Sequence, residues 1–461
     1  MINIQIAGAG AGKTYGLARD VSEYCKENSS SKVIYAVTFT NAAKEKIESE
    51  IISQIGHLPE CLAIETVHSF LLNEVIYPYS SYITNDVFQQ MSTAQLPSNV
   101  RFRNHSVGRL KRLNIIHASN VYSVARKILD RNHSNNNSRA KKLKVERVIS
   151  FIKSRIDRIY LDEAQDLDLD ALRAFSCLGV NGLHAYMIGD PKQSIKYPKA
   201  LTSFIDNLMA TESDKVNLLP INNITRRVPT EILNVSNSFC YPEQEQTSIS
   251  DLVGELLYIE STHEQFDQFI RDHIDSDSIV CIDKKAGNYS TNGKIRGSFD
   301  PKISEMIATS SHGLDPELIV KVAHSEFCEN VRLFNFRHAY RDLCQKYSIA
   351  PSPQEYRITE SYAQTIAMED TTYKVSSIDA VKGLDAETCI VVLSPTFFKY
   401  FMQQGLSNSE RFNKVWKQVY VAITRAKRQL IFVIDPVILP DLDLSLIKTS
   451  IESKGFASIE L

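Results

Sequence analysis

A glycine-rich turn between an apolar segment and a helical pattern is the feature that most constrains the fold of this chain. INIQIAG predicts a buried strand, AGAGAGKT (Ala7 to Thr14) a tight turn, and the residues up to about Cys25 a helix with one apolar face. Backbone N–H groups of such a turn and of the following helix N-terminus point at phosphate oxygens. This order of elements predicts a P-loop, which binds the phosphates of a nucleotide.

Each position of this turn predicts a contact with the nucleotide. Lys13 would reach the β- and γ-phosphates, and the hydroxyl of Thr14 would bind Mg²⁺. The first position of the pattern is Ala7 rather than glycine, and a methyl group is tolerated there if the residue keeps ordinary strand dihedrals. The predicted ligands are ATP and Mg²⁺, with ATP held by Gly8, Gly10, Gly12, Lys13 and Thr14.

A pair of acids at the end of a later apolar segment supplies the metal side of this site. In IYLDEAQD, we expect Asp162 to position Mg²⁺ and Glu163 to polarise the attacking water. Two adjacent carboxylates repel each other unless a cation lies beside them, which argues against a purely structural pair. The two motifs together predict a nucleoside triphosphatase.

Apolar segments that alternate with helical patterns predict parallel sheets with crossover helices, and therefore an α/β fold. The segments around Val33, Asp162 and Asp190 extend the first domain, and a second α/β set begins near Val216. Two stretches of polar or mixed character interrupt these domains, and we expect them to be mostly helical insertions. The predicted boundaries are 1–70 and 145–215 for the first domain, 71–144 for a basic insertion, 216–283 and 371–461 for the second domain, and 284–370 for a small second insertion.

Positive charge is concentrated in one part of the chain. The formal net charge is only −2, yet the segment from Arg101 to Arg158 has sixteen Lys and Arg against three acids. A solvated basic face is the simpler interpretation of such a run. Because like charges repel unless something anionic binds them, the excess favours contact with a nucleic-acid backbone.

The sequence argues against several other classes of protein. Eight cysteines are scattered without a CxxC pair, which predicts neither a zinc site nor a disulfide framework and favours a reducing compartment. No run of eighteen apolar residues is present, and the N-terminus lacks the pattern of a signal peptide. We therefore expect a cytoplasmic protein without a membrane partner.

The P-loop and seven further motifs, in order, resemble those of the UvrD/Rep/PcrA-type helicases of superfamily 1. The P-loop and DEAQD are similar to motifs I and II of that family. The others are VTFTNAAKEKI (motif Ia), TVHSF (Ib), GDPKQSI (III), TRRVPTEIL (IV), AVKGLDAE (V) and YVAITRAK (VI). The resemblance implies two RecA-like domains with parallel sheets, and an ATP-dependent DNA helicase that hydrolyses ATP between them while moving 3′→5′ on single-stranded DNA.

The resemblance also implies roles for single residues. Gln193 would sense the γ-phosphate, and Arg227 and Arg425 would act as arginine fingers on the transferred phosphoryl group. Asp385 would contact the ribose, and Arg226, in the place of the family's tyrosine, would stack on adenine by a cation–π contact. Residues implied to face a single- or partly double-stranded DNA are Phe39, Asn41, Thr66, His68, Tyr197 and Lys382. A core position is the alternative for His68.

Departures from the family pattern bear on partners and on function. The usual histidine of motif V is Asp379, and the short segment between Arg227 and Lys382 leaves little room for the family's large second insertion. This trimmed form resembles the helicase-like subunit of Gabija-type antiviral systems, which implies a nuclease subunit as partner. The alternative function is a DNA-stimulated ATPase that acts as a sensor or regulatory subunit without processive unwinding. A small-molecule kinase would leave Arg227 and Arg425 unexplained.

Overall fold

The computed structural model describes residues 1–27, 31–260, 265, 269, 277–286, 289–290, 299–310, 316–369, 373–403 and 405–459. These residues form two compact units, each considered by itself below. The first unit comprises residues 1–256 and 399–430, and the second comprises 257–398 and 431–461. Among the described residues, no helix has the length and apolarity needed to cross a lipid bilayer.

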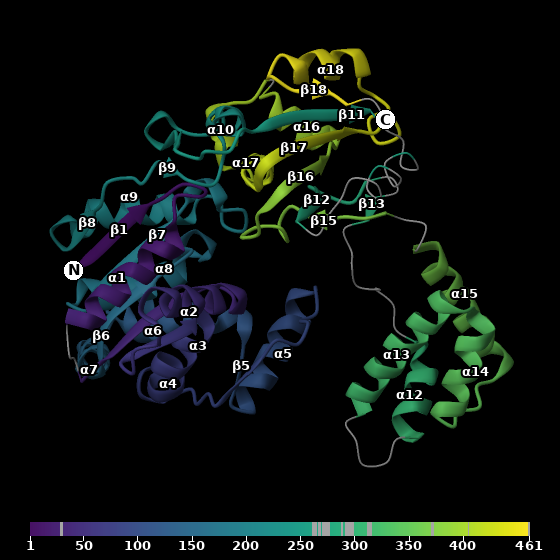
Figure 1. Ribbon diagram of the computed structural model, residues 1–461. Coiled ribbons are helices and arrows are strands. Elements are labelled where there is room, and N and C mark those ends of the chain that lie inside the picture. The colour runs from purple at the N-terminus through teal and green to yellow at the C-terminus, as the bar shows by residue number, and fades with distance from the viewer. Residues whose placement is uncertain are drawn as a thin grey trace. The chain divides into compact units, whose positions relative to one another are not determined.

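The first unit is built on a six-stranded parallel sheet with the order β3-β2-β6-β7-β1-β8 (Figure 1). The carboxyl ends of parallel strands meet at one edge, where open α/β sheets bind their ligands. The P-loop, motif Ia, motif Ib, the Asp162 pair and Asp190 each follow one of these strands, so the sheet gathers them at this edge. The strands are β1 (Ile2–Ile6), β2 (Val33–Thr38), β3 (Leu62–Thr66), β6 (Ile156–Leu161), β7 (His184–Gly189) and β8 (Val216–Leu218).

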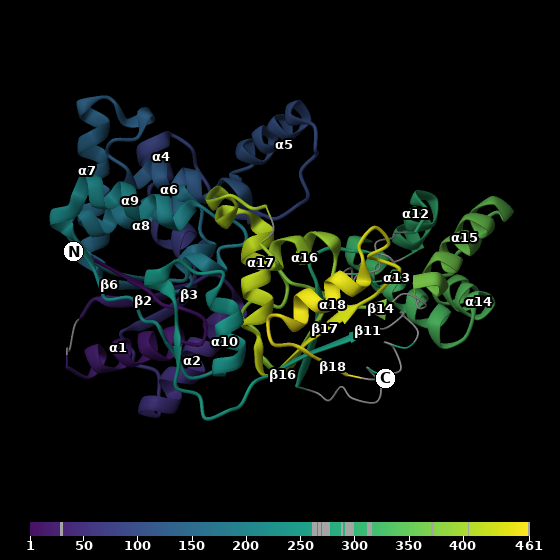
Figure 2. The ribbon, with the colours of Figure 1, turned by 90° about the horizontal axis from the view of Figure 1, so that it is seen from above.

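Helices cover both faces of this sheet (Figure 2). Successive side chains of a strand point to opposite faces. Ile34 and Ala36 therefore pack against α1 (Lys13–Glu27) and α2 (Asn41–Ile55), while Tyr35 and Val37 belong to the core on the other face. That second core is completed by η1 (Leu71–Ile76), α4 (Tyr77–Thr84), α6 (Val121–Leu129), α7 (Arg139–Arg155), α8 (Leu169–Val180) and α9 (Ala200–Glu212).

The stretch predicted as a basic insertion, 71–144, divides into two parts in the structure. Helix α6 contributes Val121, Ala125 and Ile128 to the core of the first sheet, so this part of the stretch does not form a separate body. The other part projects from it as the two-stranded sheet of β4 (Gln90–Ser92) and β5 (Ile115–His117) together with α5 (Val100–Arg112). No residue of α5 is buried.

The remainder of the first unit comes from distant parts of the sequence. Strands β9 (Ile224–Thr225) and β10 (Thr247–Ser248) pair in parallel, and they flank helix α10 (Thr230–Asn237) in the sequence. Helix α17 (Lys414–Ile423) packs against α10 and against the turn after β7. Motifs IV and VI therefore lie in the same unit as the P-loop.

The second sheet also has six strands, with the order β15-β12-β16-β17-β11-β18. Strand β12 pairs in parallel with both β15 and β16, and β11 pairs in parallel with β18. The α/β class with two RecA-like sheets is thus confirmed. The strands are β11 (Glu255–Glu260), β12 (Ser278–Ile282), β15 (Ser376–Ser377), β16 (Ala386–Val392), β17 (Ala426–Ile434) and β18 (Ala457–Ser458), with helices α16 (Pro395–Phe401) and α18 (Leu444–Glu452) beside them.

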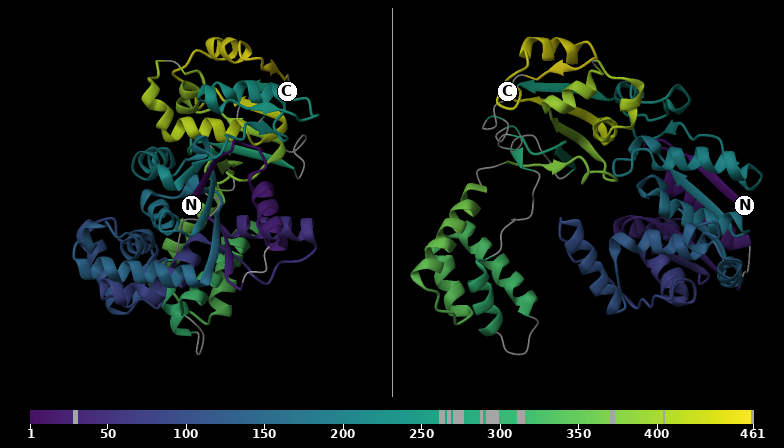
Figure 3. Two further views of the ribbon diagram at one scale, coloured as in Figure 1. Left: turned by 90° about the vertical axis from the view of Figure 1, so that its left-hand side faces the viewer. Right: turned by 180° about the vertical axis from the view of Figure 1, so that it is seen from behind.

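A helical bundle with its own core interrupts the second unit (Figure 3). Ile303, Ile307, Phe327 and Leu343 are among the side chains buried inside it. The bundle falls within the predicted insertion at 284–370. Its helices are α12 (Pro301–Ser310), α13 (Pro316–Leu333), α14 (Phe336–Lys346) and α15 (Pro353–Glu369).

Candidate nucleotide-binding site

The turn between β1 and α1 has the backbone that a P-loop requires. Gly10 and Gly12 have φ angles of 68° and 71°, in the left-handed region that favours glycine. Ala7 donates its backbone N–H to the carbonyl of Gly189 (3.1 Å) and bridges Asn222 in parallel. Ala7 therefore continues the strand, which explains why a methyl group is accommodated at the first position of the pattern.

The turn leads into a small group of polar side chains formed by Lys13, Thr14 and Asp162. The Thr14 hydroxyl donates to Oδ2 of Asp162 over 3.3 Å, and Nζ of Lys13 donates to the carbonyl of Gly8 over 3.3 Å. Burial, followed by the negative charge of Glu163, raises the pKa of Asp162 to about 7, while the positive charge of Lys13 opposes this rise. The site thus concentrates negative charge that a cation would stabilise.

These residues suit Mg²⁺ chemically. A carboxylate and a hydroxyl are hard oxygen ligands, and Mg²⁺ is usually held by one or two carboxylates together with substrate phosphates rather than by an all-protein cage. Among the described residues, no three His, Cys, Asp or Glu side chains are grouped so that they could hold a metal ion by themselves. Thr14 and Asp162 therefore fit the ion predicted from the sequence.

Glu163 is held in an unusual conformation beside Asp162. Its φ of 53° places a non-glycine residue in the left-handed region, which costs about 1–3 kcal/mol. The side-chain amide of Gln165 donates to Oε2 of Glu163, and Oε1 of Gln165 accepts from the backbone N–H of Asp190 (2.9 Å). Gln165, which sequence reasoning did not single out, fixes the direction of the Glu163 carboxylate.

Arg425 and Gln193 are joined in the buried interior of the first unit. Arg425 is only 2% exposed, and its Nη2 donates to Oε1 of Gln193 over 3.3 Å. Nε2 of Gln193 in turn donates to Oδ2 of Asp190 over 2.9 Å. Burial alone would raise the pKa of Asp190, but the charges of Lys192 and Lys13 bring it below its ordinary value. Asp190 is therefore an ionised acceptor that orients Gln193 toward Arg425.

Arg227 lies beside the P-loop itself. A Cβ atom built on Gly10 would lie 2.9 Å from Cβ of Arg227 and 2.4 Å from Oγ1 of Thr225. Nη2 of Arg227 donates to the carbonyl of Thr424 over 3.2 Å, so it reaches the residue next to Arg425. The neighbouring Arg226 contacts the carbonyl of Gly10 through its backbone N–H (3.4 Å), and its side chain is exposed.

Two residues predicted to contact the nucleotide or DNA lie in the second unit. Lys382 and Asp385 both precede β16, and Asp385 is the last residue before this strand begins. Both side chains are partly buried. Their roles remain predictions from the resemblance.

The side chains predicted to face DNA have different surroundings. Nζ of Lys196 lies 5.1 Å from the ring centre of Phe39 and 5.2 Å from that of Tyr197, which places two aromatic faces around one cation. Asn41 begins α2 and is exposed. Thr66 caps α3 (Val67–Phe70) by accepting from the backbone N–H of Ser69.

His68 is half-buried and lies against Tyr122. Its ring centre lies 4.8 Å from that of Tyr122, and the Tyr122 hydroxyl is 3.3 Å from Nδ1. Burial lowers the pKa of His68 below its ordinary value. The imidazole is therefore disfavoured as a positively charged phosphate ligand.

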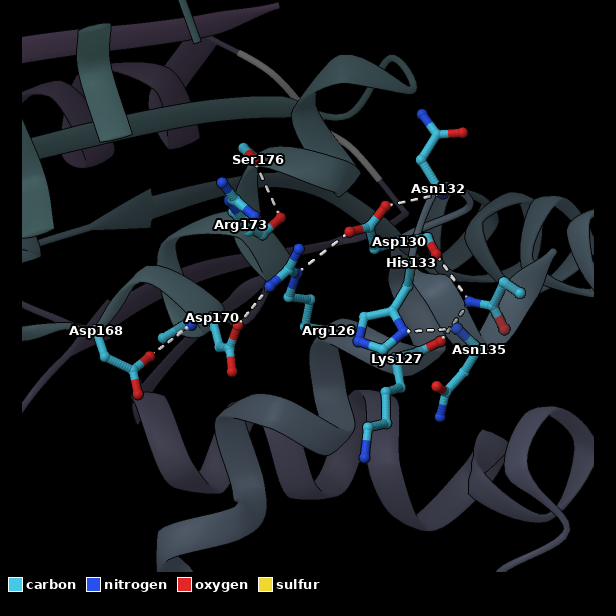
Figure 4. Close-up of polar contacts among 12 residues, drawn as sticks. Arg126, Lys127, Asp130, Asn132, His133, Asn135, Asp168, Asp170, Arg173 and Ser176 are labelled. Atoms are coloured by element: carbon cyan, nitrogen blue, oxygen red, sulfur yellow. Dashed lines mark hydrogen bonds and ion pairs between the residues drawn. The ribbon is translucent and has the colours of Figure 1, made fainter. Parts of the chain in front are cut away.

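Only some of the basic residues between Arg101 and Arg158 form ion pairs with acids. Arg126 pairs with both Asp130 (3.2 Å) and Asp170 (2.7 Å), as Figure 4 shows. Arg131 pairs with Glu146 over 2.6 Å. On α5, Lys111 pairs with Asp86. Within the described part of the chain, no acid forms an ion pair with Arg101, Arg109 or Arg112 of α5.

Lys417, on α17, is a buried cation near Asp190 and Lys192. It is 6% exposed, and burial lowers its pKa to about 8 from the ordinary 10.5, an effect that the charge of Asp190 partly opposes. Between these two pH values the unfolded chain keeps a proton that the folded chain releases, so stability rises with pH in this window. Below pH 8 both states are protonated, and the full cost of burying the charge is present.

We therefore expect Lys417→Met to stabilise the protein at pH 7. The gain should be up to about 3 kcal/mol, since one pKa unit corresponds to about 1.4 kcal/mol. Differential scanning calorimetry at pH 7 and pH 10 would measure it, and the rise in Tm should shrink at the higher pH. Lys414→Met, at an exposed position of the same helix, is the control. A rise in Tm of equal size at both pH values would show that packing, not charge, is responsible.

Comparison with known proteins agrees with this geometry. Residues 2–198 match a family model described as an AAA domain. The Gabija protein GajB of Bacillus cereus (strain VD045) is 31% identical over 247 residues, which cover 50% of this chain and 45% of GajB. The alignment thus spans less than half the length of that relative.

Solved structures of a viral helicase also align with this chain. One is arterivirus nonstructural protein 10 (helicase), which is 12% identical, covers 96% of this chain and 61% of its own, and has a TM-score of 0.36. The other is the complex of that helicase with DNA, which is 11% identical, covers 97% of this chain and 63% of its own, and has a TM-score of 0.37. The family match and the identity with GajB confirm the resemblance stated from the motifs. Residues 2–198 thus match an AAA domain, and the chain is similar to the Gabija protein GajB over 247 residues.

Proposed function

We propose that this chain is an ATP-dependent translocase that hydrolyses ATP with Mg²⁺ at its P-loop and moves 3′→5′ along single-stranded DNA. The observation that carries the proposal is the contact of Arg425 with Gln193, over 3.3 Å. Three and four residues after Gln193 come Lys196 and Tyr197, which lie with Phe39 at the same edge of the sheet. The segment 193–197 therefore contacts an arginine-finger candidate, Arg425, at one end and offers a stacking surface for bases at the other.

Hydrolysis at this site needs no covalent chemistry from the protein. Lys13 would neutralise the phosphates, Glu163 would orient the attacking water, and Arg227 and Arg425 would stabilise the charge that develops on the transferred group. Mg²⁺, held by Thr14 and Asp162, would supply further positive charge at the phosphates. Arg226 and Asp385 would contact the base and ribose of ATP.

A nucleotide-dependent change at Gln193 would be transmitted to the DNA-facing residues. A ligand drives movement only if it binds two conformations with different affinity. Loss of the γ-phosphate removes the group that Gln193 and Arg425 would share, and this favours a second position of Lys196 and Tyr197. Phe39 and Tyr197 offer stacking faces worth about 1–3 kcal/mol per base, with Asn41, Thr66, His68 and Lys382 as further contacts proposed from the resemblance.

The test is the rate of ATP hydrolysis with no nucleic acid, and with single-stranded DNA, RNA or duplex DNA. We expect single-stranded DNA to stimulate hydrolysis most, and a duplex with a 3′ single-stranded tail to be displaced in an ATP-dependent manner. Hydrolysis that no nucleic acid stimulates would contradict the proposal.

A second candidate is an ATPase sensor that works with a nuclease subunit in antiviral defence. It is favoured by the similarity to the Gabija protein GajB. Stimulation of hydrolysis by DNA without strand displacement, together with ATP-dependent modulation of a bound nuclease, would favour the sensor over the translocase.

The exposed arginines of α5 lead to a prediction on binding. We expect Arg101→Glu, Arg109→Glu and Arg112→Glu together to weaken single-stranded DNA binding, because their charges lack acidic partners within the described chain. Three lost phosphate contacts should reduce the slope of log Kd against log salt concentration by about 2. Fluorescence anisotropy at several salt concentrations would measure this.

The control for this prediction is Arg131→Glu, which changes an arginine already paired with Glu146. It should leave the salt slope almost unchanged. An unchanged slope in the triple variant would show that α5 does not contact the DNA backbone.

A further inference from the structure

The side chain of Gln246 is paired with the backbone of the P-loop. Gln246 directly precedes β10, and its side chain is buried, with 4% of it exposed. Its Nε2 donates to the carbonyl of Ala9 over 2.9 Å, and its Oε1 accepts from the N–H of Ala9 over 3.1 Å. One carboxamide thus satisfies both backbone groups of a residue inside the phosphate-binding turn.

The backbone of Gln246 is held in the same reciprocal way by Asn237, the last residue of α10. The N–H of Gln246 donates to Oδ1 of Asn237 over 3.0 Å, and its carbonyl accepts from Nδ2 of Asn237 over 2.9 Å. Two amide pairs in series, Asn237 to Gln246 and Gln246 to Ala9, therefore tie helix α10 to the P-loop.

Gln246 also explains why the second position of the turn is glycine. A Cβ atom built on Gly8 would lie 2.2 Å from Cδ of Gln246, closer than any real contact. Gly8 does not need a left-handed backbone, whereas Gly12 does, and around Gly12 the nearest atom to such a Cβ is 4.0 Å away. Glycine at position 8 is thus required by the packing of Gln246 rather than by the shape of the backbone.

The hydroxyl of Tyr420 connects this contact to the acid that orients Gln193. It donates to Oε1 of Gln246 over 2.9 Å and lies 3.5 Å from Oδ2 of Asp190. Tyr420 is fully buried, and burial raises the pKa of its phenol well above the ordinary value, so the hydroxyl remains a donor. Gln246 therefore lies between the P-loop and the Asp190–Gln193–Arg425 contacts.

We propose that Gln246 is a positioning residue of the nucleotide site, an inference that rests on the proposed ATPase function. It holds Gly8 and Ala9 in the shape that receives the phosphates, and it ties that shape to Tyr420 and Asp190. Without it, the buried carbonyl of Ala9 loses its partner, and the N–H of Ala9 keeps only its longer contact with the Tyr420 hydroxyl (3.4 Å). The loop must then be ordered when ATP binds.

The first test is Gln246→Ala. Loss of two hydrogen bonds should raise the Kd of Mg²⁺ with a non-hydrolysable ATP analogue about tenfold, measured by equilibrium dialysis. The KM for ATP should rise in parallel, with a smaller change in kcat. Asn136→Ala is the matched control, since Asn136 is also a buried carboxamide, 1% exposed, with two hydrogen bonds to backbone carbonyls. The control should lower Tm without changing nucleotide affinity.

The second test is a pair of compensating changes. Gly8→Ala alone should weaken nucleotide binding more than Gln246→Ala, because the new methyl group collides with the carboxamide. In Gly8→Ala/Gln246→Ala the methyl group has room, and affinity should return to that of Gln246→Ala. A double variant as weak as Gly8→Ala would show that the methyl group disturbs the nucleotide rather than Gln246, and this would overturn the proposal, as would an unchanged Kd in Gln246→Ala.

Tyr420→Phe provides a gentler variant, should the others fold poorly, because it removes only a hydroxyl. The Tyr420 hydroxyl donates to Gln246 and also accepts from the N–H of Ala9 over 3.4 Å. We expect about a threefold rise in Kd from its loss, and a combined effect with Gln246→Ala that is not the simple product of the two single effects. Independent, additive effects would contradict the connection through Gln246. Binding of the analogue is measured without turnover, so a native protein that binds but never hydrolyses ATP would refute the proposed function and leave this test intact.

Discussion

Lys13→Ala is expected to abolish ATP hydrolysis. Nζ of Lys13 donates to the carbonyl of Gly8 within the P-loop turn over 3.3 Å. Removing one preorganised charge that stabilises a transition state lowers turnover about 10²–10³-fold, and this lysine also contributes to nucleotide binding. A coupled assay of phosphate release, at saturating ATP and with single-stranded DNA present, would measure the loss.

The charge of Lys13 has a second effect in the folded protein. It opposes the rise that burial causes in the pKa of Asp162, and it helps to hold the pKa of Asp190 below its ordinary value. Lys13→Ala should therefore also change the stability of the first unit, so Tm is recorded beside the rate. Lys26→Ala, at an exposed position of the same helix, should alter neither. Full turnover in Lys13→Ala would show that the nucleotide site has been assigned to the wrong residues.

Arg425→Gln is expected to lower turnover about 10³-fold or more while ATP still binds, since arginine fingers contribute about 10³–10⁵ to turnover. Glutamine keeps a donor that can reach Gln193 but lacks the charge that would stabilise the transferred phosphoryl group. Glutamine is larger than alanine, so it leaves a smaller cavity than alanine would at a position only 2% exposed.

Single-turnover hydrolysis and analogue binding separate the two effects of this change. Binding should stay within a few-fold of the native value, and the chemical step should become slow. Arg428→Gln is the control, at an exposed position of β17, the strand that begins directly after Arg425. If Arg425→Gln hydrolyses ATP at the native rate, Arg425 only supports the fold through its bonds to Gln193 and to the carbonyl of Val421.

The residues proposed to contact phosphates and metal were predictable because their chemistry is local. The P-loop is one contiguous turn, and its glycines, Lys13 and Thr14 follow from the order strand, turn and helix. Asp162 needed only the end of a parallel strand to reach Thr14. The π-helical turn at Leu71–Ile76, the core position of α6 and the sixth strand β8 were not predicted, because short or irregular segments have little periodicity of their own.

Residues whose roles depend on partners were harder to interpret. TVHSF predicted that His68 faces DNA, and the structure adds a neighbour that the motif did not indicate, Tyr122, which is 54 residues away in the sequence. Gln246 had no signal at all, since one glutamine in a polar loop predicts no contact. Its partners are 237 residues away at Ala9 and 174 residues away at Tyr420.

The sequence by itself determined the strand–turn–helix that binds phosphate, the acidic pair beside it and the α/β class with two sheets. Only the tertiary structure decided that Gln246 occupies the space beside Gly8 and that Arg425 contacts Gln193. It also decided which basic residues are paired: Arg126 and Arg131 have acidic partners, whereas Arg101, Arg109 and Arg112 of α5 have none among the described residues. The physical reason is that backbone geometry and charge along a short segment are local properties. Which buried hydrogen-bonding groups satisfy one another is settled only when distant segments pack together.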